Sequence, residues 1–270
     1  MHNYWIANFD SVAFSLGPLD IRWYSIAYMV GFLVGYQFCI YLSRYQPRSR
    51  AITSKQLESF LLWAVLAVIL GGRLGYVLFY YPIFYLQNPL EIIKIWQGGM
   101  SFHGGALGVV LAMFWFAKRH HIDFLSLSDL IVCAVPIGLG LGRLANFING
   151  ELWGKPSDVK WAVIFPRAGP EPRHPSQLYE AGLEGLVLLV LLWFLAVKLK
   201  AFYKAGYLSG VFLLGYSVFR SLSEIWREPE ILVDQLPFAT SWGQWLSLPM
   251  LIVGVGLIWY AHRFSKPKGP

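Results

Sequence analysis

The chain has 270 residues, of which 56% are hydrophobic and only 14% are charged, whereas a soluble domain carries about 25% charged residues. This composition excludes an ordinary soluble protein and indicates a chain dissolved in lipid. The formal net charge of +7 does not indicate nucleic-acid binding, because the basic residues lie in separate short loops instead of one solvated patch. Cys39 and Cys133 lie in separate apolar runs and support neither a disulfide framework nor a zinc site.

Seven apolar runs have the length that a membrane-spanning helix requires, about 17 to 25 residues. They lie near residues 21–43, 57–81, 99–117, 127–148, 178–197, 206–224 and 243–261. Tryptophans occur at the ends of several of these runs, as the aromatic belts of a membrane interface require. We therefore predict an all-α, polytopic membrane protein with seven transmembrane helices, which forms a single domain over residues 1–270.

Basic residues follow every second span, and this asymmetry predicts the orientation of the chain. The basic residues that follow spans one, three, five and seven are Arg44, Arg48, Arg50, Lys55, Lys118, Arg119, Lys198, Lys200, Lys204, Arg263, Lys266 and Lys268. We expect these segments to be cytoplasmic, which places the N-terminus outside and the C-terminus inside. The loop at about 149–177, rich in Pro and Gly, is then predicted to form a small irregular cap on the outer side.

Charged and polar residues interrupt four of the predicted spans, where each charge costs at least a few kcal/mol. These residues are Arg73 in span two, His103 in span three, Arg143 and Asn146 in span four, and Arg220 and Glu224 in span six. The predicted topology places all of them near the outer ends of their helices, which favours one shared site. Simpler interpretations remain open: an arginine that snorkels, a packed histidine, or a structural ion pair between Arg220 and Glu224, which are four residues apart. The glycines around Arg73 also fit close helix packing.

The same region favours a bound phosphate. Span three begins at Gly98-Gly99-Met100-Ser101, and a helix N-terminus presents free N–H groups and a positive dipole end. Arginine adds a planar fork that matches phosphate oxygens. A phosphate at this depth most simply belongs to a phospholipid. There is no Asp-rich metal motif, HExxH or Walker loop, and Ser209 fails the GxSxG spacing, so we expect a reaction without metal or cofactor.

Five segments carry a resemblance to a known family. They are Gly142-Arg-Leu-Ala-Asn-Phe-Ile-Asn-Gly-Glu-Leu-Trp-Gly154, His103-Gly-Gly-Ala-Leu-Gly108, Arg173-His-Pro-Ser-Gln-Leu-Tyr-Glu180, Arg22-Trp-Tyr24, and Phe219-Arg220 through Glu224 to Arg227. The first resembles the signature segment of the bacterial prolipoprotein diacylglyceryl transferases, and the others are similar to further segments of that family. The resemblance covers nearly the whole chain, although the outer loop near 155–172 is short and Ala145 stands where glycine is also used.

The resemblance implies a multi-pass enzyme of the bacterial cytoplasmic (inner) membrane, with its active site toward the outer leaflet. It would transfer the diacylglyceryl group of phosphatidylglycerol to the lipobox cysteine of a prolipoprotein signal peptide, the first step of lipoprotein maturation. The partners implied are phosphatidylglycerol, the prolipoprotein and membrane lipids, with no nucleic acid. The catalytic residues implied are His103, Arg143 and Arg220, and the substrate-binding residues expected beside them are Tyr24, Arg73, Asn146, Asn149, Glu151, Gly154, Tyr216, Glu224 and Arg227.

A mechanism follows as a hypothesis. A cysteine thiol has a pKa near 8.5, so a base or a positive field must raise its thiolate fraction at neutral pH. His103 is the candidate base, and the arginines would neutralise the departing glycerol phosphate. Two rival functions remain. A transporter would continue its polar groups through the inner half of the membrane, which is almost wholly apolar here, and a structural subunit would use the buried charges for helix contacts.

Overall fold

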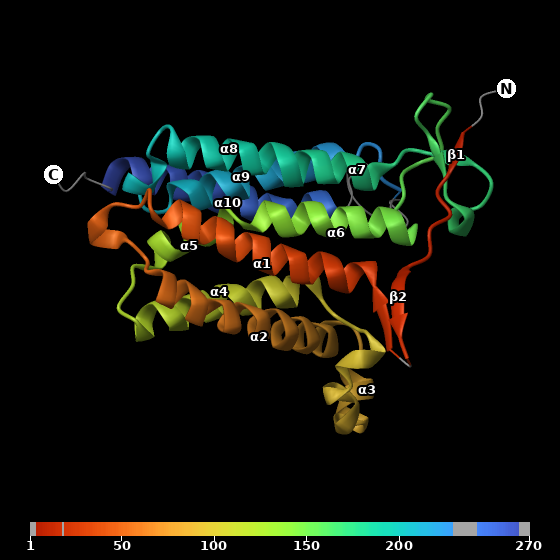
Figure 1. Ribbon diagram of the computed structural model, residues 1–270, viewed down its shortest axis with the longest axis horizontal. Helices are drawn as coiled ribbons and strands as arrows, with labels where there is room; N and C mark the ends of the chain where they lie inside the picture. Colours follow the sequence, from red (N-terminus) through yellow and green to blue (C-terminus); the bar gives the residue numbers. More distant parts are fainter. Residues whose placement is uncertain (1–3, 18, 229–241, 265–270) are drawn as a thin grey trace. The chain divides into compact units, whose positions relative to one another are not determined.

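A computed structural model describes residues 4–17, 19–228 and 242–264 (Figure 1). The described chain is mostly helical. Its main helices are α1 (Trp23–Ser43), α2 (Ser54–Phe79), α3 (Pro82–Gln87), α4 (Phe102–Arg119), α5 (Phe124–Val132), α6 (Val135–Asn149), α7 (Ser176–Glu180), α8 (Leu188–Val197), α9 (Tyr207–Ser223) and α10 (Trp242–Phe264). A π-helix, η5 (Ala181–Val187), joins α7 to α8. Short 3-10 turns are η1 (Arg48–Arg50), η2 (Pro89–Ile93), η3 (Ile95–Gln97), η4 (Pro166–Ala168) and η6 (Ala201–Tyr203).

Five helical stretches are long and apolar enough to cross a membrane. They are Trp23–Ser43, Arg48–Phe79, Phe124–Asn149, Ser176–Val197 and Gly243–Phe264. They confirm five of the seven predicted spans as apolar helices of sufficient length. The two other predicted spans also form helices, α4 and α9, which have 18 and 17 residues and are not among those five.

The chain packs as two compact units. Unit 1 comprises residues 1–45 and 129–270, and unit 2 comprises residues 46–128. In unit 1, α6 packs against α1 and η5, while α9 packs against α8 and α10 (Figure 1). In unit 2, α4 packs along α2. The single domain over residues 1–270 stays a prediction.

Glycines allow the closest helix contacts in each unit. In unit 2, a Cβ atom on Gly104 of α4 would lie 2.4 Å from the carbonyl oxygen of Gly71 in α2. In unit 1, a Cβ on Gly185 of η5 would lie 2.7 Å from the Cα of Gly140 in α6. Because helices in lipid associate through close packing of small residues, these glycines set which helix faces meet. The interpretation of the glycines beside Arg73 as packing residues is confirmed.

Several helix ends have partners that satisfy their free backbone groups. Thr53 and Gln56 form a capping box at the start of α2, and the Ser101 hydroxyl accepts a hydrogen bond from Gly104 N at the start of α4. The buried Asp129 carboxylate accepts hydrogen bonds from Gly206 N and Ser209 N at the start of α9, each at 2.8 Å. Ser209 also donates its hydroxyl proton to Asp129. The Asp129 carboxylate thus caps the start of α9, and Ser209 is one of its donors.

The prediction of an all-α fold is incomplete, because short strands lie at one end of unit 1. Strands β1 (Trp5–Ile6), β4 (Val163–Ile164) and β5 (Pro172–Arg173) form a three-stranded sheet, parallel between β1 and β4 and antiparallel between β4 and β5. Strands β2 (Val12–Leu16) and β3 (Leu19–Arg22) form a hairpin. The sheet lies where α6 ends and α7 begins (Figure 1). A small core of Ala7, Phe147, Val163 and Phe165 packs at this end, and an outer cap over residues 149–177 stays a prediction.

Candidate active site

Charged side chains from α6, α7, η5 and α9 meet inside unit 1. The Arg143 guanidinium on α6 lies 3.2 Å from an oxygen of Glu180 and 3.2 Å from an oxygen of Glu184. Arg220 on α9 lies 2.6 Å from the other oxygen of Glu180 and forms an ion pair with Glu224 one turn further along α9. We call this group, completed by Arg227, the Arg–Glu cluster.

Glu180 is shared by three arginines of the cluster. Besides Arg143 and Arg220, it accepts a hydrogen bond of 3.1 Å from Arg227. Its side chain is fully buried, and no arginine or glutamate of the cluster has a side chain more than 15% exposed. An isolated charge at this burial would be strongly destabilising, so mutual pairing is what allows the charges to remain here.

The backbone brings these side chains together in identifiable ways. The Gly140–Gly185 contact allows α6 to approach η5 closely, which places Arg143 next to both glutamates of the α7–η5 segment. A π-helix inside a longer helix is frequent at functional sites. Arg220 and Glu224 are four residues apart at the end of α9 and form the ion pair that the sequence left open as an alternative. At the start of α10, a Cβ on Gly243 would lie 2.6 Å from Glu224 Oε1, so only glycine leaves this ion pair undisturbed.

A second polar network, centred on a carboxylate, surrounds the end of α6. The Asn146 side-chain amide donates hydrogen bonds of 2.9 Å to the Tyr24 hydroxyl and to the Glu151 carboxylate. Asn149 donates to the same carboxylate, and Gln177 donates to the backbone carbonyl of Glu151. Four residues predicted from the sequence, Tyr24, Asn146, Asn149 and Glu151, are therefore in one hydrogen-bond network. Asn146 faces α1 while Arg143 faces η5, so these two predicted neighbours contact different partners.

Gly154 connects the loop over residues 149–177 to the cluster. Its backbone pairs with Arg227 in an isolated β-bridge, and its N–H donates to the His174 carbonyl at 3.0 Å. A Cβ at this position would lie 2.6 Å from the carbonyl oxygens of His174 and of Trp226. Gly154 thus holds the segment that carries Arg227. Tyr216, on α9, is buried and within electrostatic range of Glu184, Arg143 and Arg220.

Arg73 and His103 lie in unit 2. The buried Arg73 guanidinium donates hydrogen bonds to backbone carbonyls of the segment between α2 and α4, and it lies 5.3 Å from the ring centroid of Tyr85. Its acceptors are the carbonyl oxygens of Glu91, Ile92, Lys94, Gly98 and Gly99. His103, near the start of α4, is exposed and contacts the ring of Phe102. Whether these two residues join the cluster stays a prediction.

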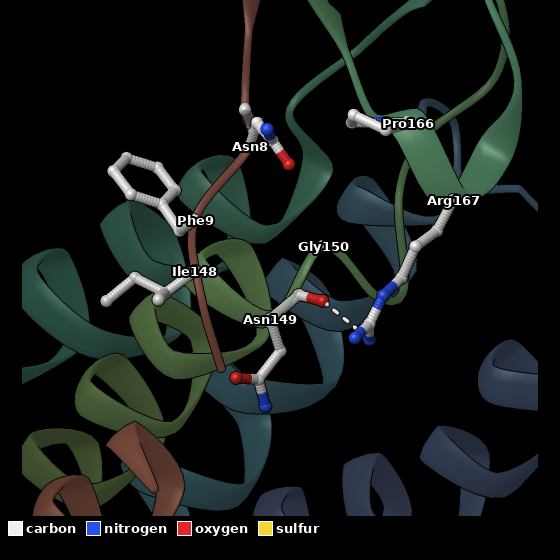
Figure 2. A pocket seen from close by; sticks show the side chains of 8 residues that line it. Asn8, Phe9, Ile148, Asn149, Gly150, Pro166 and Arg167 are labelled. Atoms are coloured by element: carbon white, nitrogen blue, oxygen red, sulfur yellow. Dashed lines mark hydrogen bonds between the residues drawn. The ribbon is translucent and has the colours of Figure 1, made fainter. Parts of the chain in front are cut away.

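Two hollows lie outside the cluster. One of about 40 Å³ is formed by the N-terminal segment, the end of α6 and η4, where the Arg167 side chain points to the carbonyl of Asn149 and donates to it at 3.0 Å (Figure 2). The other, of about 330 Å³, is lined by Trp63, Trp115, Lys118 and Arg119 of unit 2. Across residues 4–17, 19–228 and 242–264, no group of three or more His, Cys, Asp and Glu side chains is arranged to hold a metal ion.

Sequence reasoning missed Glu180 and Glu184 as site residues. Glu180 ends the Arg173–Glu180 segment that carries part of the family resemblance, and Glu184 lies four residues further inside an apolar run. A charge inside a predicted span was the signal available for both. Their partner Arg143 is about 40 residues away in the sequence, so the pairing itself has no local signature.

Comparison with known proteins decides the family. The family model for prolipoprotein diacylglyceryl transferase matches residues 11–260. The chain belongs to the prolipoprotein diacylglyceryl transferase family. Relatives named phosphatidylglycerol–prolipoprotein diacylglyceryl transferase include one from Gluconacetobacter diazotrophicus, 52% identical over 97% of this chain and 93% of the relative. Others are from Gluconobacter oxydans, 52% identical over 95% of this chain and 94% of the relative, and Nitrosomonas europaea, 50% identical over 96% and 93%.

As a member of the prolipoprotein diacylglyceryl transferase family, the chain is a transferase, and its apolar helices are consistent with a membrane enzyme. The matched residues include the whole Arg–Glu cluster, the network around Glu151, and both Arg73 and His103. Every candidate site residue therefore lies in the part of the chain that defines the family.

Proposed function

We propose that the chain transfers the diacylglyceryl group of phosphatidylglycerol to the lipobox cysteine thiol of prolipoproteins. The products are a thioether-linked lipoprotein precursor and glycerol phosphate. The names of the relatives support this reaction, and the observation that carries it to this chain is the pair Arg143 and Arg220, held by buried glutamates in one unit. Transport and a purely structural role are less well supported, since the relatives are named as transferases.

In the proposed membrane arrangement, α4 and α9 also cross the bilayer, giving seven spans. At a rise of about 1.5 Å per residue, helices of 17 and 18 residues reach about 26 Å, near the thickness of the hydrocarbon core. Basic residues after alternate spans then place the N-terminus and the cap outside the bacterial inner membrane, and the C-terminus in the cytoplasm. The Arg–Glu cluster, near the cap end of unit 1, faces the outer leaflet.

In the proposed reaction, the cysteine thiolate attacks the glyceryl methylene carbon that is bonded to the phosphodiester oxygen. The carbon–oxygen bond breaks, and the charge that develops on the phosphate is neutralised by Arg143 and Arg220. Both guanidiniums are already fixed by carboxylates, so little reorganisation is needed in the transition state. Further residues line or orient this site. They are the network around Glu151, with Tyr24, Asn146 and Asn149, and the residues Tyr216, Glu224 and Arg227. Gly154 holds the backbone of the site.

Arg73 and His103 complete the proposal from unit 2. Arg73 is proposed to fix the segment between α2 and α4 of unit 2 through its carbonyl acceptors. His103 lies near the N-terminus of α4, where free N–H groups favour an anion, and it is proposed to contact the substrates there.

Arg143→Ala and Arg143→Lys test the proposal. Removing one preorganised donor lowers rates by about 100-fold to 1,000-fold in oxyanion sites, and lysine keeps the charge but loses the two-pronged geometry. We expect both variants to lose at least about 100-fold in the rate at which a lipobox peptide gains the mass of diacylglycerol. Lys118→Gln with Arg119→Gln, on the surface of unit 2, is the matched control. Full activity in both Arg143 variants would contradict the proposal.

A further inference from the structure

Glu184 combines two features that neither Glu180 nor Glu224 combines: it is paired with a single arginine, and one of its buried oxygens has no hydrogen-bond partner among the described residues. Its Oε2 atom lies 3.2 Å from Arg143 Nη2, while its Oε1 atom is buried and has no hydrogen-bond partner among the described residues. Buried carboxylate oxygens normally accept hydrogen bonds. The Oε1 atom of Glu184 accepts no hydrogen bond and belongs to a carboxylate beside Arg143, which is proposed to hold phosphate. This oxygen is therefore placed to receive a proton.

We propose that Glu184 accepts the proton of the lipobox thiol and passes it to the departing phosphate. The inference rests on the proposed function and deepens it. The S–H proton moves to a Glu184 oxygen, the thiolate forms the bond from sulfur to the glyceryl methylene, and the carbon–oxygen bond breaks toward phosphate. The proton then moves from Glu184 to a phosphate oxygen. The glycerol phosphate leaves with one negative charge, the same as the original diester, so no further proton or co-reactant is required.

Three other glutamates of this part of unit 1 are less suited to this task. The Oε2 atom of Glu180 also accepts no hydrogen bond, but it lies 3.2 Å from Arg143. The Oε1 atom of Glu180 lies 2.6 Å from Arg220 and 3.1 Å from Arg227. Glu180 is thus occupied in holding three arginines of the cluster together. Glu224 is paired with Arg220. Glu151 accepts hydrogen bonds from two amide groups.

The surroundings of Glu184 explain how one carboxylate can both take and release a proton. Arg143 faces it from α6, Glu180 from the preceding turn, and Arg220 and Tyr216 from α9. Charges of both signs therefore surround Glu184, two from arginines and one from a second carboxylate. A phosphate bound at Arg143 adds negative charge next to Glu184 and shifts the balance toward the protonated form when the thiol arrives.

The experiment compares Glu184→Gln with Glu184→Asp and His103→Gln, in purified full-length protein with phosphatidylglycerol vesicles and a lipobox peptide. General-base catalysis contributes about 100-fold to 10,000-fold, so we expect Glu184→Gln to be at least 100-fold slower at pH 7. The deficit should shrink about tenfold per pH unit up to the thiol pKa near 8.5, because the thiol then ionises unaided. Glu184→Asp should keep the pH profile of the unmodified chain at a lower rate.

A peptide with selenocysteine in place of cysteine separates proton transfer from structure, because a selenol is ionised at neutral pH. We expect Glu184→Gln to be nearly as fast as the unmodified chain with this peptide, whereas His103→Gln should be equally impaired with both peptides. A deficit in Glu184→Gln that is the same at every pH and with both peptides would overturn the assignment. Absence of transfer by the unmodified chain would instead overturn the proposed function.

Discussion

The substitution Glu180→Gln tests whether one carboxylate holds the arginines of the site. Glutamine has nearly the same size as glutamate, so the change removes charge with little change in volume. In the structure, Glu180 is fully buried and lies 3.2 Å from Arg143, 2.6 Å from Arg220 and 3.1 Å from Arg227. After the substitution, Arg143 keeps Glu184 and Arg220 keeps Glu224 as ion-pair partners. Arg227 loses its ion pair with the Glu180 carboxylate.

The expected loss can be given a magnitude. Removing one partner of a buried ion pair destabilises a protein by about 3 to 5 kcal/mol. One kcal/mol corresponds to about 2 to 4 °C in the unfolding midpoint of a domain near this size. We therefore expect Glu180→Gln to lower the midpoint by about 6 to 20 °C, measured on purified protein in a fixed detergent. The loss of activity should be the same at every pH, whereas the loss in Glu184→Gln should shrink as the pH rises.

Glu171→Gln is the matched control for Glu180→Gln. Glu171 also lies near an arginine, at 3.9 Å from Arg173, but its side chain is 65% exposed. An exposed pair of this kind contributes at most about 1 kcal/mol, so its loss should change the midpoint little. If Glu180→Gln changed the midpoint no more than Glu171→Gln does, the argument that Glu180 organises the cluster would be wrong.

Two further substitutions test contacts of the loop over residues 149–177. Gly154→Ala should lower both activity and the unfolding midpoint, because its Cβ would lie 2.6 Å from two backbone carbonyls, whereas Gly182→Ala, with open space around its Cβ, should change neither; equal effects would refute this reasoning. Burial, and secondarily Lys155, lower the pKa of His174, so the folded protein keeps this histidine neutral to a lower pH than the unfolded chain does. The contribution of neutral His174 to the stability of the folded protein is therefore present above about pH 6.5 and is lost as the pH falls. The unfolding midpoint of the protein should fall relative to that of His174→Gln between pH 7 and 5, and a constant difference would contradict the assignment.

Features with a local signature could be predicted from the sequence. The run at 57–81 predicts α2, found at Ser54–Phe79, because hydropathy and helix length depend only on neighbouring residues. The spacing of four between Arg220 and Glu224 predicts their ion pair for the same reason. The signature segment at residues 142–154 led to Arg143, Asn146 and Glu151, which the structure places in two networks of unit 1, and their roles in binding and catalysis stay predictions.

Features that depend on contacts far apart in the sequence could not be predicted. Arg143 pairs with Glu184 across 41 residues, and Asp129 caps α9 across 77 residues. Strand β1 pairs with β4, more than 150 residues away, and each has only two residues, which is too short for a period-2 pattern. The sequence predicted that the charge of Arg73 would be buried. It did not predict that backbone carbonyls would surround the guanidinium, because those carbonyls belong to a segment about 20 residues further along the chain.

The most direct measurement is the amount of glycerol phosphate released from phosphatidylglycerol by purified protein, with a lipobox peptide that contains cysteine and with one that contains alanine instead. We expect one glycerol phosphate for each peptide that gains diacylglycerol, almost no release with the alanine peptide, and a rate at least about 100-fold lower in Arg220→Lys. Release that is independent of the thiol, or undiminished release in Arg220→Lys, would contradict a transferase site built on the Arg–Glu cluster.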